Sequence, residues 1–197
     1  LYGSMKVCIV GGFLGSGKTT LLMKMAKRTK GNTVMIINEM GEIGVDGSTV
    51  KNAGYNAIEL FDGCICCTLV GTLQNTLIQI KKDFDPELII IEPTGLALPH
   101  KIKEMVRTSM IEPELTMIVG ICDAFRFKTL VKKKEDFLRM QLSRSDLFLL
   151  NKIDKADNAS IKAASAWLES LNPRTRIIQI SGLTGEGLED AFSEIGL

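Results

Sequence analysis

Short apolar runs alternate with amphipathic stretches along this chain of 197 residues. Each run is almost continuously hydrophobic, which is typical of strands buried on both faces of a parallel sheet. Strands are predicted over residues 5–10, 33–38, 56–60, 87–92, 115–122, 146–151 and 176–181. Helical spacing of apolar residues predicts helices over residues 17–29, 69–82, 99–109, 134–144, 159–171 and 187–195. This alternation predicts an α/β fold, with a doubly wound, largely parallel sheet flanked by helices.

The predicted elements form a single domain over residues 5–197, because no repeat, low-complexity segment or linker interrupts them. Leu1 to Ser4 are interpreted as a remnant of cloning, and no second, C-terminal domain is expected. The hydrophobic fraction of 45% is enough to fill a core, and the net charge of +1 gives no sign of a nucleic-acid or membrane partner. No apolar run has the roughly 18 residues of a membrane span, and no secretory signal precedes Met5. A cytoplasmic location is therefore expected.

A phosphate-binding loop is predicted between the first strand and the first helix. The segment Gly12-Phe13-Leu14-Gly15-Ser16-Gly17-Lys18-Thr19 fits the pattern G-x-x-x-x-G-K-[ST]. Its glycines let backbone N–H groups turn inward around a phosphate, and the helix N-terminus adds a positive dipole end. Lys18 is expected to reach the β- and γ-phosphates, and the Thr19 hydroxyl is expected to coordinate Mg²⁺. The predicted nucleotide-binding residues here are Gly15, Ser16, Gly17, Lys18, Thr19 and Thr20.

The residues that close the predicted strand 146–151 indicate that the base is guanine. The carboxylate of Asp154 can accept hydrogen bonds from both the ring N–H and the exocyclic amine of guanine. Adenine has no matching pair of donors on that edge. The stem of Lys152 can lie along the purine, and Asn151 can tie this loop to the phosphate loop. Backbone contacts to the guanine oxygen are expected after the last strand, from Ser181, Gly182 and Leu183.

A γ-phosphate sensor is predicted at the end of strand 87–92, where Glu92 is followed by Gly95. Most small GTPases have Asp at the first of these positions, where it holds Mg²⁺ through water, and Gly at the second, where it touches the γ-phosphate. The side chain of Glu92 is one methylene longer. It could hold a Mg²⁺-bound water or orient the attacking water, and the sequence leaves both roles open. Lys18 and Glu92 are the predicted catalytic residues.

Three of the five cysteines, Cys64, Cys66 and Cys67, lie within four positions. Thiolates suit Zn²⁺, Co²⁺ or Cu⁺, and such sites generally need three or four ligands. Cys8 and Cys122 lie in predicted strands and are expected to be buried like small apolar residues. One short loop would then supply two or three thiolates to an open site, as suits a metal that is passed on. A redox pair and simple packing stay open as alternatives for the same thiols.

The chain resembles the CobW-like branch of the metallochaperone GTPases related to UreG and HypB. That group has Glu in place of Asp in the third nucleotide motif. The matching segments cover nearly the whole chain in family order: "GGFLGSGKTT" (11–20), "NEMGEIGVDG" (38–47), "GCICCTL" (63–69), "EPTGLALP" (92–99), "CDA" (122–124), "QLSRSDLFLLNKID" (141–154) and "SGLTGEG" (181–187). The chain departs from the family at Val70, Thr72 and Leu98, where relatives often carry Arg, Asp, and Asp or Asn.

The resemblance implies a P-loop GTPase fold, hydrolysis of GTP to GDP with Mg²⁺, and nucleotide-dependent homodimerisation. It also implies delivery of a transition metal, usually Zn²⁺ or Co²⁺, to a client metalloprotein or cofactor-insertion enzyme. The family's Cys-x-Cys-Cys motif falls on Cys64, Cys66 and Cys67, which are therefore the expected ligands of the transferable metal.

Residues 38–47 contain three glycines and are predicted to act as a switch. Glu39, Glu42 and Asp46 in this segment can meet Mg²⁺ or the transferable metal, and Asp46 is the preferred candidate for the Mg²⁺ environment. Glu39, Glu42, His100, a second protomer or the client could fill the open metal position. Hydrolysis is expected to be slow without a partner, because no residue is recognisable as an arginine finger or a water-orienting glutamine.

The function predicted from the sequence is a GTPase that couples nucleotide state to metal handling. Two other classes stay open. One is a regulatory GTPase whose cysteines form a thiol switch. The other is a P-loop kinase of small molecules, which the Asn-Lys-x-Asp segment ending at Asp154 disfavours.

Overall fold

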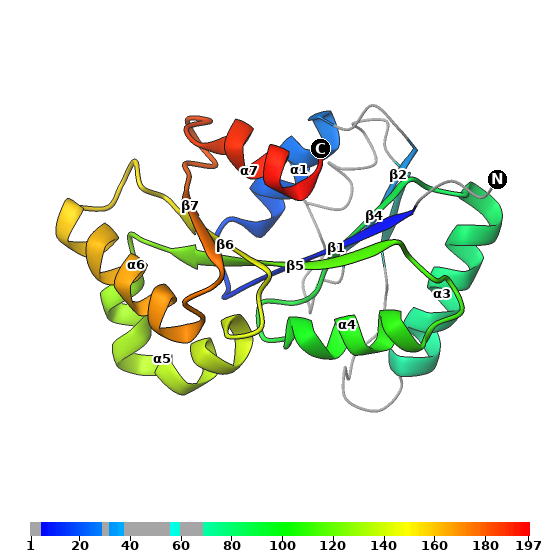
Figure 1. Ribbon diagram of the computed structural model, residues 1–197, viewed down its shortest axis with the longest axis horizontal. Coiled ribbons are helices and arrows are strands. Elements are labelled where there is room, and N and C mark those ends of the chain that lie inside the picture. The colour runs from blue at the N-terminus through cyan, green and yellow to red at the C-terminus, as the bar shows by residue number, and fades with distance from the viewer. Residues whose placement is uncertain (1–4, 29–31, 38–55, 60–68) are drawn as a thin grey trace.

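The computed structural model describes residues 5–28, 32–37, 56–59 and 69–197. In this part of the chain seven strands form one sheet in the order β3-β2-β4-β1-β5-β6-β7. Every pair of neighbouring strands is parallel (Figure 1). The strands are β1 (Lys6–Gly12), β2 (Thr33–Ile37), β3 (Asn56–Glu59), β4 (Leu88–Glu92), β5 (Leu115–Asp123), β6 (Leu147–Asn151) and β7 (Arg176–Gln179). The described helices are α1 (Lys18–Arg28), α3 (Leu69–Phe84), α4 (Pro99–Thr108), α5 (Phe127–Leu142), α6 (Asn158–Leu171) and α7 (Leu188–Ile195).

The predicted doubly wound α/β fold is confirmed, and a strand forms in each predicted apolar run. The sheet is fully parallel over the described strands rather than largely parallel. Strands β2, β4 and β6 are buried along their whole length. This burial is the reason why their sequences are almost continuously apolar and do not alternate with polar residues.

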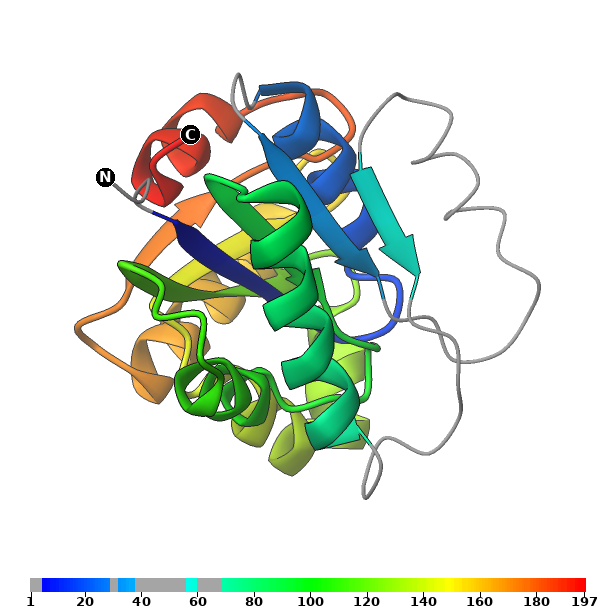
Figure 2. The same ribbon diagram turned by 90° about the vertical axis from the view of Figure 1, so that its right-hand side faces the viewer.

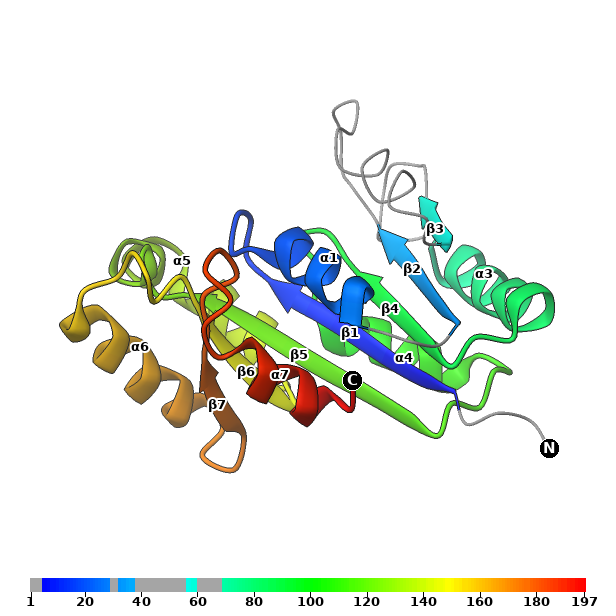
Figure 3. The same cartoon turned by 90° about the horizontal axis from the view of Figure 1, so that it is seen from above.

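Helices cover both faces of the sheet (Figures 1 and 2). α1 and α7 lie on one face, where their apolar residues pack on strand residues such as Val10 and Val119. α3 and α4 lie on the other face, over β1, β2 and β4. α5 and α6 share that second face and pack against β6 at Phe148 and Leu150. The result is a three-layer domain in which the strand order runs from β7 at one edge to β3 at the other (Figure 3).

Helix α5 begins at Phe127, so the predicted start at residue 134 is wrong. Lys134 has φ −145° and ψ 27°, which is not helical, and it divides α5 into two halves. Phe127 is buried in the first half, whereas Leu138 and Leu142 are buried in the second. Because the kink turns one half relative to the other, the apolar spacing does not continue through it. The sequence pattern therefore showed only the second half as a helix.

Because the strands are parallel, they bring the predicted nucleotide motifs together along the side of the sheet that is formed by the carboxyl ends of the strands. The phosphate-binding loop follows β1, Glu92 ends β4, Asn151 ends β6, and Ser181 comes just after β7. β1 lies at the centre of the sheet. The chain first builds the strands on one side of it, β2, β3 and β4, and then the strands on the other side, β5, β6 and β7. Ligands of open α/β sheets bind at the carboxyl ends of strands beside such a reversal of strand order.

Candidate functional site

The loop between β1 and α1 has the backbone conformation that its glycines were predicted to allow. Gly15 and Gly17 have φ values of +69° and +102°, in the left-handed region that favours glycine. A Cβ at Gly17 would lie 2.3 Å from Nδ2 of Asn151, so a larger residue there would displace the neighbouring loop. Ser16, between these glycines, is 1% exposed. α1 begins at Lys18, so the N–H groups at its N-terminus face the same space as this loop.

The predicted catalytic pair, Lys18 and Glu92, is brought together at the start of α1. Lys18 is 7% exposed and Glu92 is 6% exposed. Thr19 donates a hydrogen bond from Oγ1 to Glu92, with distances of 3.2 Å to Oε1 and 3.4 Å to Oε2. Burial of the ammonium lowers the pKa of Lys18 from its usual 10.5, and the charge of Glu92 partly opposes this shift.

The oxygens of Thr19 and Glu92 fit a Mg²⁺ site. Mg²⁺ prefers oxygen ligands and usually sits between one or two protein groups and the phosphates of a nucleotide. Here a hydroxyl and a buried carboxylate are already within hydrogen-bond distance, next to the phosphate-binding loop. Glu92 therefore lies where either of its two predicted roles, holding a metal-bound water or orienting the attacking water, is possible.

We expect nucleotide binding to take up a proton at alkaline pH because the pKa of Lys18 is lowered before a phosphate is present. A triphosphate beside the ammonium favours the charged form and raises this pKa. At a pH between the pKa of Lys18 in the free protein and its pKa in the complex, nucleotide binding is accompanied by protonation of Lys18. Nucleotide affinity should therefore fall as the pH rises through the lowered pKa of the free protein. Calorimetry in buffers of different ionisation enthalpy measures this proton uptake. The measurement is made above the pH at which the terminal phosphate has lost its last proton, so that the phosphate does not contribute to it.

Lys18→Arg is the matched variant for this measurement, because a guanidinium keeps its proton throughout the range. Its binding should involve no comparable proton uptake. Equal proton uptake by the wild type and Lys18→Arg would show that the proton goes to another group.

Asn151, which ends β6, joins three nucleotide motifs and is 2% exposed. Its Nδ2 donates to the carbonyl oxygen of Ser16 at 2.8 Å. Its Oδ1 accepts from the N–H of Lys152 at 2.8 Å and from the N–H of Gly182 at 2.9 Å. The predicted tie from Asn151 to the phosphate-binding loop is therefore confirmed. The same side chain also holds the loop after β7, which the sequence did not suggest.

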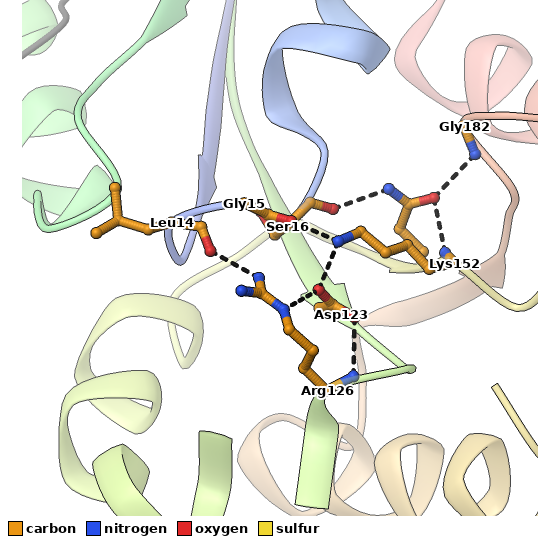
Figure 4. Close-up of polar contacts among 8 residues, drawn as sticks. Leu14, Gly15, Ser16, Asp123, Arg126, Lys152 and Gly182 are labelled. Atoms are coloured by element: carbon orange, nitrogen blue, oxygen red, sulfur yellow. Dashed lines mark hydrogen bonds and ion pairs between the residues drawn. The ribbon is translucent and has the colours of Figure 1, made fainter. Parts of the chain in front are cut away.

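Lys152 lies across the outside of the phosphate-binding loop (Figure 4). Its Nζ donates to the carbonyl oxygen of Gly15 at 2.5 Å and to Oδ2 of Asp123 at 2.8 Å. The backbone of Lys152 has a φ of +67°, which is uncommon for a residue other than glycine. Strain of this kind at a strand end is typical of functional sites. The side chain is thus fixed beside the position predicted for the purine.

Asp123 and Arg126 also belong to this site, and the sequence reasoning missed them. Asp123 ends β5 and its side chain is fully buried, where it accepts hydrogen bonds from Lys152, from Nε of Arg126 at 2.6 Å and from the N–H of Arg126 at 3.0 Å. Arg126 also donates from one guanidinium N–H to the carbonyl oxygen of Leu14 at 2.6 Å (Figure 4). The signal for Asp123 was present, because the segment 122–124 matched the family. Nothing local marked Arg126.

The remaining predicted base-contacting residues lie at the same edge of the sheet. Asp154 is exposed, whereas Ser181 is fully buried. The N–H of Ser181 donates to Glu186, and the N–H of Gly182 donates to Asn151. Leu183 is 72% exposed, and its N–H has no hydrogen bond within the described residues. The structure therefore favours Leu183 among these three for the backbone contact to the guanine oxygen.

Gly95 and Thr20 complete the predicted nucleotide-binding residues. A Cβ at Gly95 would lie 2.7 Å from Cδ2 and 2.8 Å from the backbone nitrogen of Leu14. Only glycine allows this approach, which places the predicted γ-phosphate sensor directly against the phosphate-binding loop. Thr20 is exposed in the first turn of α1, close to Gly182.

Comparison with known protein families identifies the family to which this chain belongs. A family profile for the CobW/HypB/UreG nucleotide-binding domain matches residues 6–179. The chain belongs to the CobW/HypB/UreG family. The resemblance seen in the sequence motifs is thereby confirmed.

Two curated relatives of this CobW/HypB/UreG chain carry the name zinc chaperone. The chain is 33% identical to the zinc chaperone CobW of Sinorhizobium sp, over 87% of this chain and 57% of the relative. It is 31% identical to the zinc chaperone YeiR of Escherichia coli K12, over 81% of this chain and 50% of the relative. The chain thus spans about half the length of the curated relatives it matches.

Solved structures share the fold of this CobW/HypB/UreG domain. The hydrogenase maturation factor HypB from Archaeoglobus fulgidus matches with a TM-score of 0.71 at 21% identity, over 98% of this chain and 89% of that chain. The zinc-bound YjiA GTPase from E. coli matches with a TM-score of 0.64 at 26% identity, over 89% of this chain and 57% of that chain.

Apart from Thr19, the predicted metal ligands of this CobW/HypB/UreG chain lie outside the described residues. This applies to Cys64, Cys66 and Cys67, and to Glu39, Glu42 and Asp46. Among the residues that the structure does describe, no three His, Cys, Asp or Glu side chains are placed to hold a metal ion. The predicted metal site stays a prediction.

The other two cysteines are buried, as predicted, at 2% and 8% exposure for Cys8 and Cys122. Burial raises the pKa of each thiol to about 12, which keeps both protonated and unsuited to binding a metal. His100, which the sequence offered for the open metal position, is partly buried at the start of α4, where burial and the charges of Arg144 and Lys101 lower its pKa.

No helix in the described part of the chain is both long and apolar enough to cross a membrane.

Proposed function

We propose that this chain binds GTP with Mg²⁺, hydrolyses it slowly, and couples its nucleotide state to the binding and delivery of a transition metal. Zinc is the first candidate for the metal, because the curated relatives with 33% and 31% identity are both named zinc chaperones. Cobalt, the other metal expected from the sequence, is the second. The client is a metalloprotein or a cofactor-insertion enzyme, and nucleotide-dependent homodimerisation belongs to the same proposal.

The junction at Asn151 supports the nucleotide part of the proposal most strongly. One buried side chain bonds the phosphate-binding loop, the loop that carries Asp154 and the loop after β7. Lys152 and Asp123 add a second connection to the phosphate-binding loop. The binding groups for the phosphates and for the base are thereby held at fixed positions before a ligand arrives, which reduces the entropy lost on binding.

Each site residue then has a distinct task in hydrolysis. The ammonium of Lys18 balances charge on the β- and γ-phosphates, and the glycine-rich backbone orients them. Thr19 and Glu92 would hold Mg²⁺, which would supply positive charge against the negative charge that develops on the phosphates. Gly95 offers its N–H beside the phosphate-binding loop. Arg126 is already bonded to Asp123 and Leu14, so the described residues offer no unengaged arginine at the loop, which agrees with slow turnover.

The metal part of the proposal rests on Cys64, Cys66 and Cys67 and on the curated relatives. These cysteines lie between the predicted switch at residues 38–47 and the γ-phosphate sensor that contains Gly95. A change in these segments on binding GTP could therefore alter the metal site. Metal and nucleotide would then affect each other's affinity by the same factor.

We expect the Cys66→Ser, Cys67→Ser double variant to lose zinc affinity by roughly a hundredfold or more, because it removes two soft thiolate ligands. A chelator competition with the reduced protein measures this affinity, in the presence of GDP or of a non-hydrolysable GTP analogue. Cys8→Ala is the matched control, since Cys8 is buried in the core and should not affect zinc affinity.

Two outcomes of this titration, and a parallel test of mild oxidation, separate the hypotheses. Zinc affinity that differs between GDP and the GTP analogue, and is lost in the double variant, supports the metallochaperone. Zinc affinity that does not depend on the nucleotide contradicts the coupling. A stoichiometric loss of free thiols on mild oxidation, with no zinc bound, would instead favour the thiol switch.

A further inference from the structure

Gln141 in the last turn of α5 is a buried polar residue with no role in the function proposed above. It is 2% exposed. Its Nε2 donates to two carbonyl oxygens of the loop between β4 and α4, that of Gly95 at 3.0 Å and that of Ala97 at 2.9 Å. This is the loop that carries the predicted γ-phosphate sensor. The contact therefore connects the sensor to a helix that lies more than forty positions later in the sequence.

The chemistry of the contact fixes the orientation of the amide. Two carbonyl oxygens can only accept hydrogen bonds, so the NH₂ group must face them and the Oε1 atom must point away. Both amide hydrogens are thereby used. Gly95 and Ala97 are themselves buried, so loss of this amide would leave two carbonyl oxygens without their partner.

The sensor loop is thus held from two sides. On one side Gly95 lies against Leu14 of the phosphate-binding loop, too close for any Cβ. On the other side Gln141 holds the carbonyl group of the same residue. A glycine backbone is otherwise free to rotate, so these two contacts restrict the conformation at Gly95 and thereby limit where its N–H can point.

Helix α5 holds the phosphate-binding loop as well. Arg126, at the N-cap of α5, donates to the carbonyl oxygen of Leu14 at 2.6 Å. Phe137, in the second half of α5, packs edge-to-face on Phe13, with ring centroids 6.0 Å apart. The kink at Lys134 lies between these two contacts. One helix therefore fixes the two backbone segments that would lie on either side of a γ-phosphate.

We propose that Gln141 is a positioning residue that sets Gly95 for the γ-phosphate and so determines how strongly this chain prefers GTP to GDP. The proposal rests on the function proposed above. GDP has no γ-phosphate, so its affinity depends on the phosphate-binding loop and the base-binding residues and is independent of Gly95. Loss of the Gln141 contact should weaken GTP binding selectively. A residue that only stabilised the fold would affect both nucleotides equally.

The test compares Gln141→Met with the wild type. Methionine keeps the length and volume of the side chain and removes both hydrogen bonds. The affinity for a non-hydrolysable GTP analogue with Mg²⁺ should fall roughly tenfold, as expected for two lost hydrogen bonds, while GDP affinity stays within about twofold. Isothermal titration calorimetry of the full chain measures both.

Gln74→Met is the matched control. The amide of Gln74, in α3, donates to Oγ1 of Thr108 at 2.7 Å and so also joins a helix to a neighbouring segment, but it touches no nucleotide motif. This control should leave the ratio of GTP to GDP affinity unchanged. Unfolding of every variant is followed through the fluorescence of Trp167, the single tryptophan. Gln141→Leu is the second variant should Gln141→Met not fold, because it also removes both donors and places no charge or unpaired polar atom in the buried position.

The outcomes distinguish this proposal from the one on which it rests. Wild type that binds neither the GTP analogue nor GDP contradicts both. Wild type that binds both, with a Gln141 variant that loses GTP and GDP affinity equally or loses neither, overturns the positioning role alone. A selective loss of GTP affinity in the Gln141 variant and not in Gln74→Met supports it.

Discussion

Replacing Asp154 with asparagine is expected to change the base preference of this chain from guanine to xanthine. The carboxylate of Asp154 offers two acceptors to the ring N–H and the exocyclic amine of guanine. An asparagine amide offers one acceptor and one donor, which match the ring N–H and the carbonyl oxygen that xanthine carries in place of the amine. GTP affinity should fall by roughly a hundredfold or more, since a site built for a polar group strongly rejects an analogue that leaves it unpaired.

Competition with a fluorescent nucleotide measures the affinities of GTP, XTP and ATP for the Asp154→Asn variant. The matched control is Asp157→Asn, which makes the same chemical change three residues later. Asp157 caps α6 by accepting from the N–H of Ser160 at 2.5 Å, and asparagine is an equally good N-cap. Base preference should therefore not change in the control. A variant at Asp154 that binds GTP as tightly as the wild type, or gains no XTP affinity, would reopen the small-molecule kinase class.

The residues that could be predicted from the sequence are those whose signal is local. The phosphate-binding loop needs glycines where the backbone takes positive φ, and Gly15 and Gly17 occupy those positions. A strand buried on both faces needs a continuous apolar run, and the four residues of β4 that precede Glu92 are such a run. The order of the motifs along parallel strands then places all of them at one edge of the sheet. None of these three steps requires knowledge of contacts between distant residues.

The features that the sequence did not reveal depend on pairs of residues far apart in the chain. Arg126 bonds Leu14 across 112 positions, and Gln141 bonds Gly95 across 46. No spacing rule links such residues. Arg126 was unremarkable in the sequence, and Gln141 was marked only as the first residue of a segment that matches the family. The kink at Lys134 hid the first half of α5 from its apolar periodicity. All three oversights therefore concern α5, the helix that contacts both the phosphate-binding loop and the loop after β4.

Replacing Asn151 with alanine should have the largest effect on stability and on nucleotide binding together. The substitution removes one donor and one acceptor that serve three hydrogen bonds, all within 2.9 Å and at a residue that is 2% exposed. Buried partners left without a hydrogen bond cost about 1–3 kcal/mol each, so the free energy of unfolding should fall by about 3 kcal/mol or more. Denaturant unfolding followed by Trp167 fluorescence measures the loss. Asn172→Ala is the control, because Asn172 accepts a single long hydrogen bond of 3.3 Å at the exposed end of α6.

Nucleotide affinity should fall in Asn151→Ala even under conditions where the variant is fully folded. Without Asn151 the carbonyl of Ser16 loses its partner, and the loop at Gly182 is no longer tied to the loop that carries Asp154. The phosphate and base groups must then be ordered by the nucleotide itself, which uses binding energy that the wild type retains. A loss of affinity of roughly a hundredfold for both GTP and GDP is expected, because Asn151 holds the loops that bind the base and the phosphates that GTP and GDP share.

This equal loss contrasts with the GTP-selective loss expected at Gln141. The two variants together separate the residues that bind both nucleotides from those that distinguish GTP from GDP. Affinity within tenfold of the wild type would mean that Lys152 and Asp123 alone keep the loops in place.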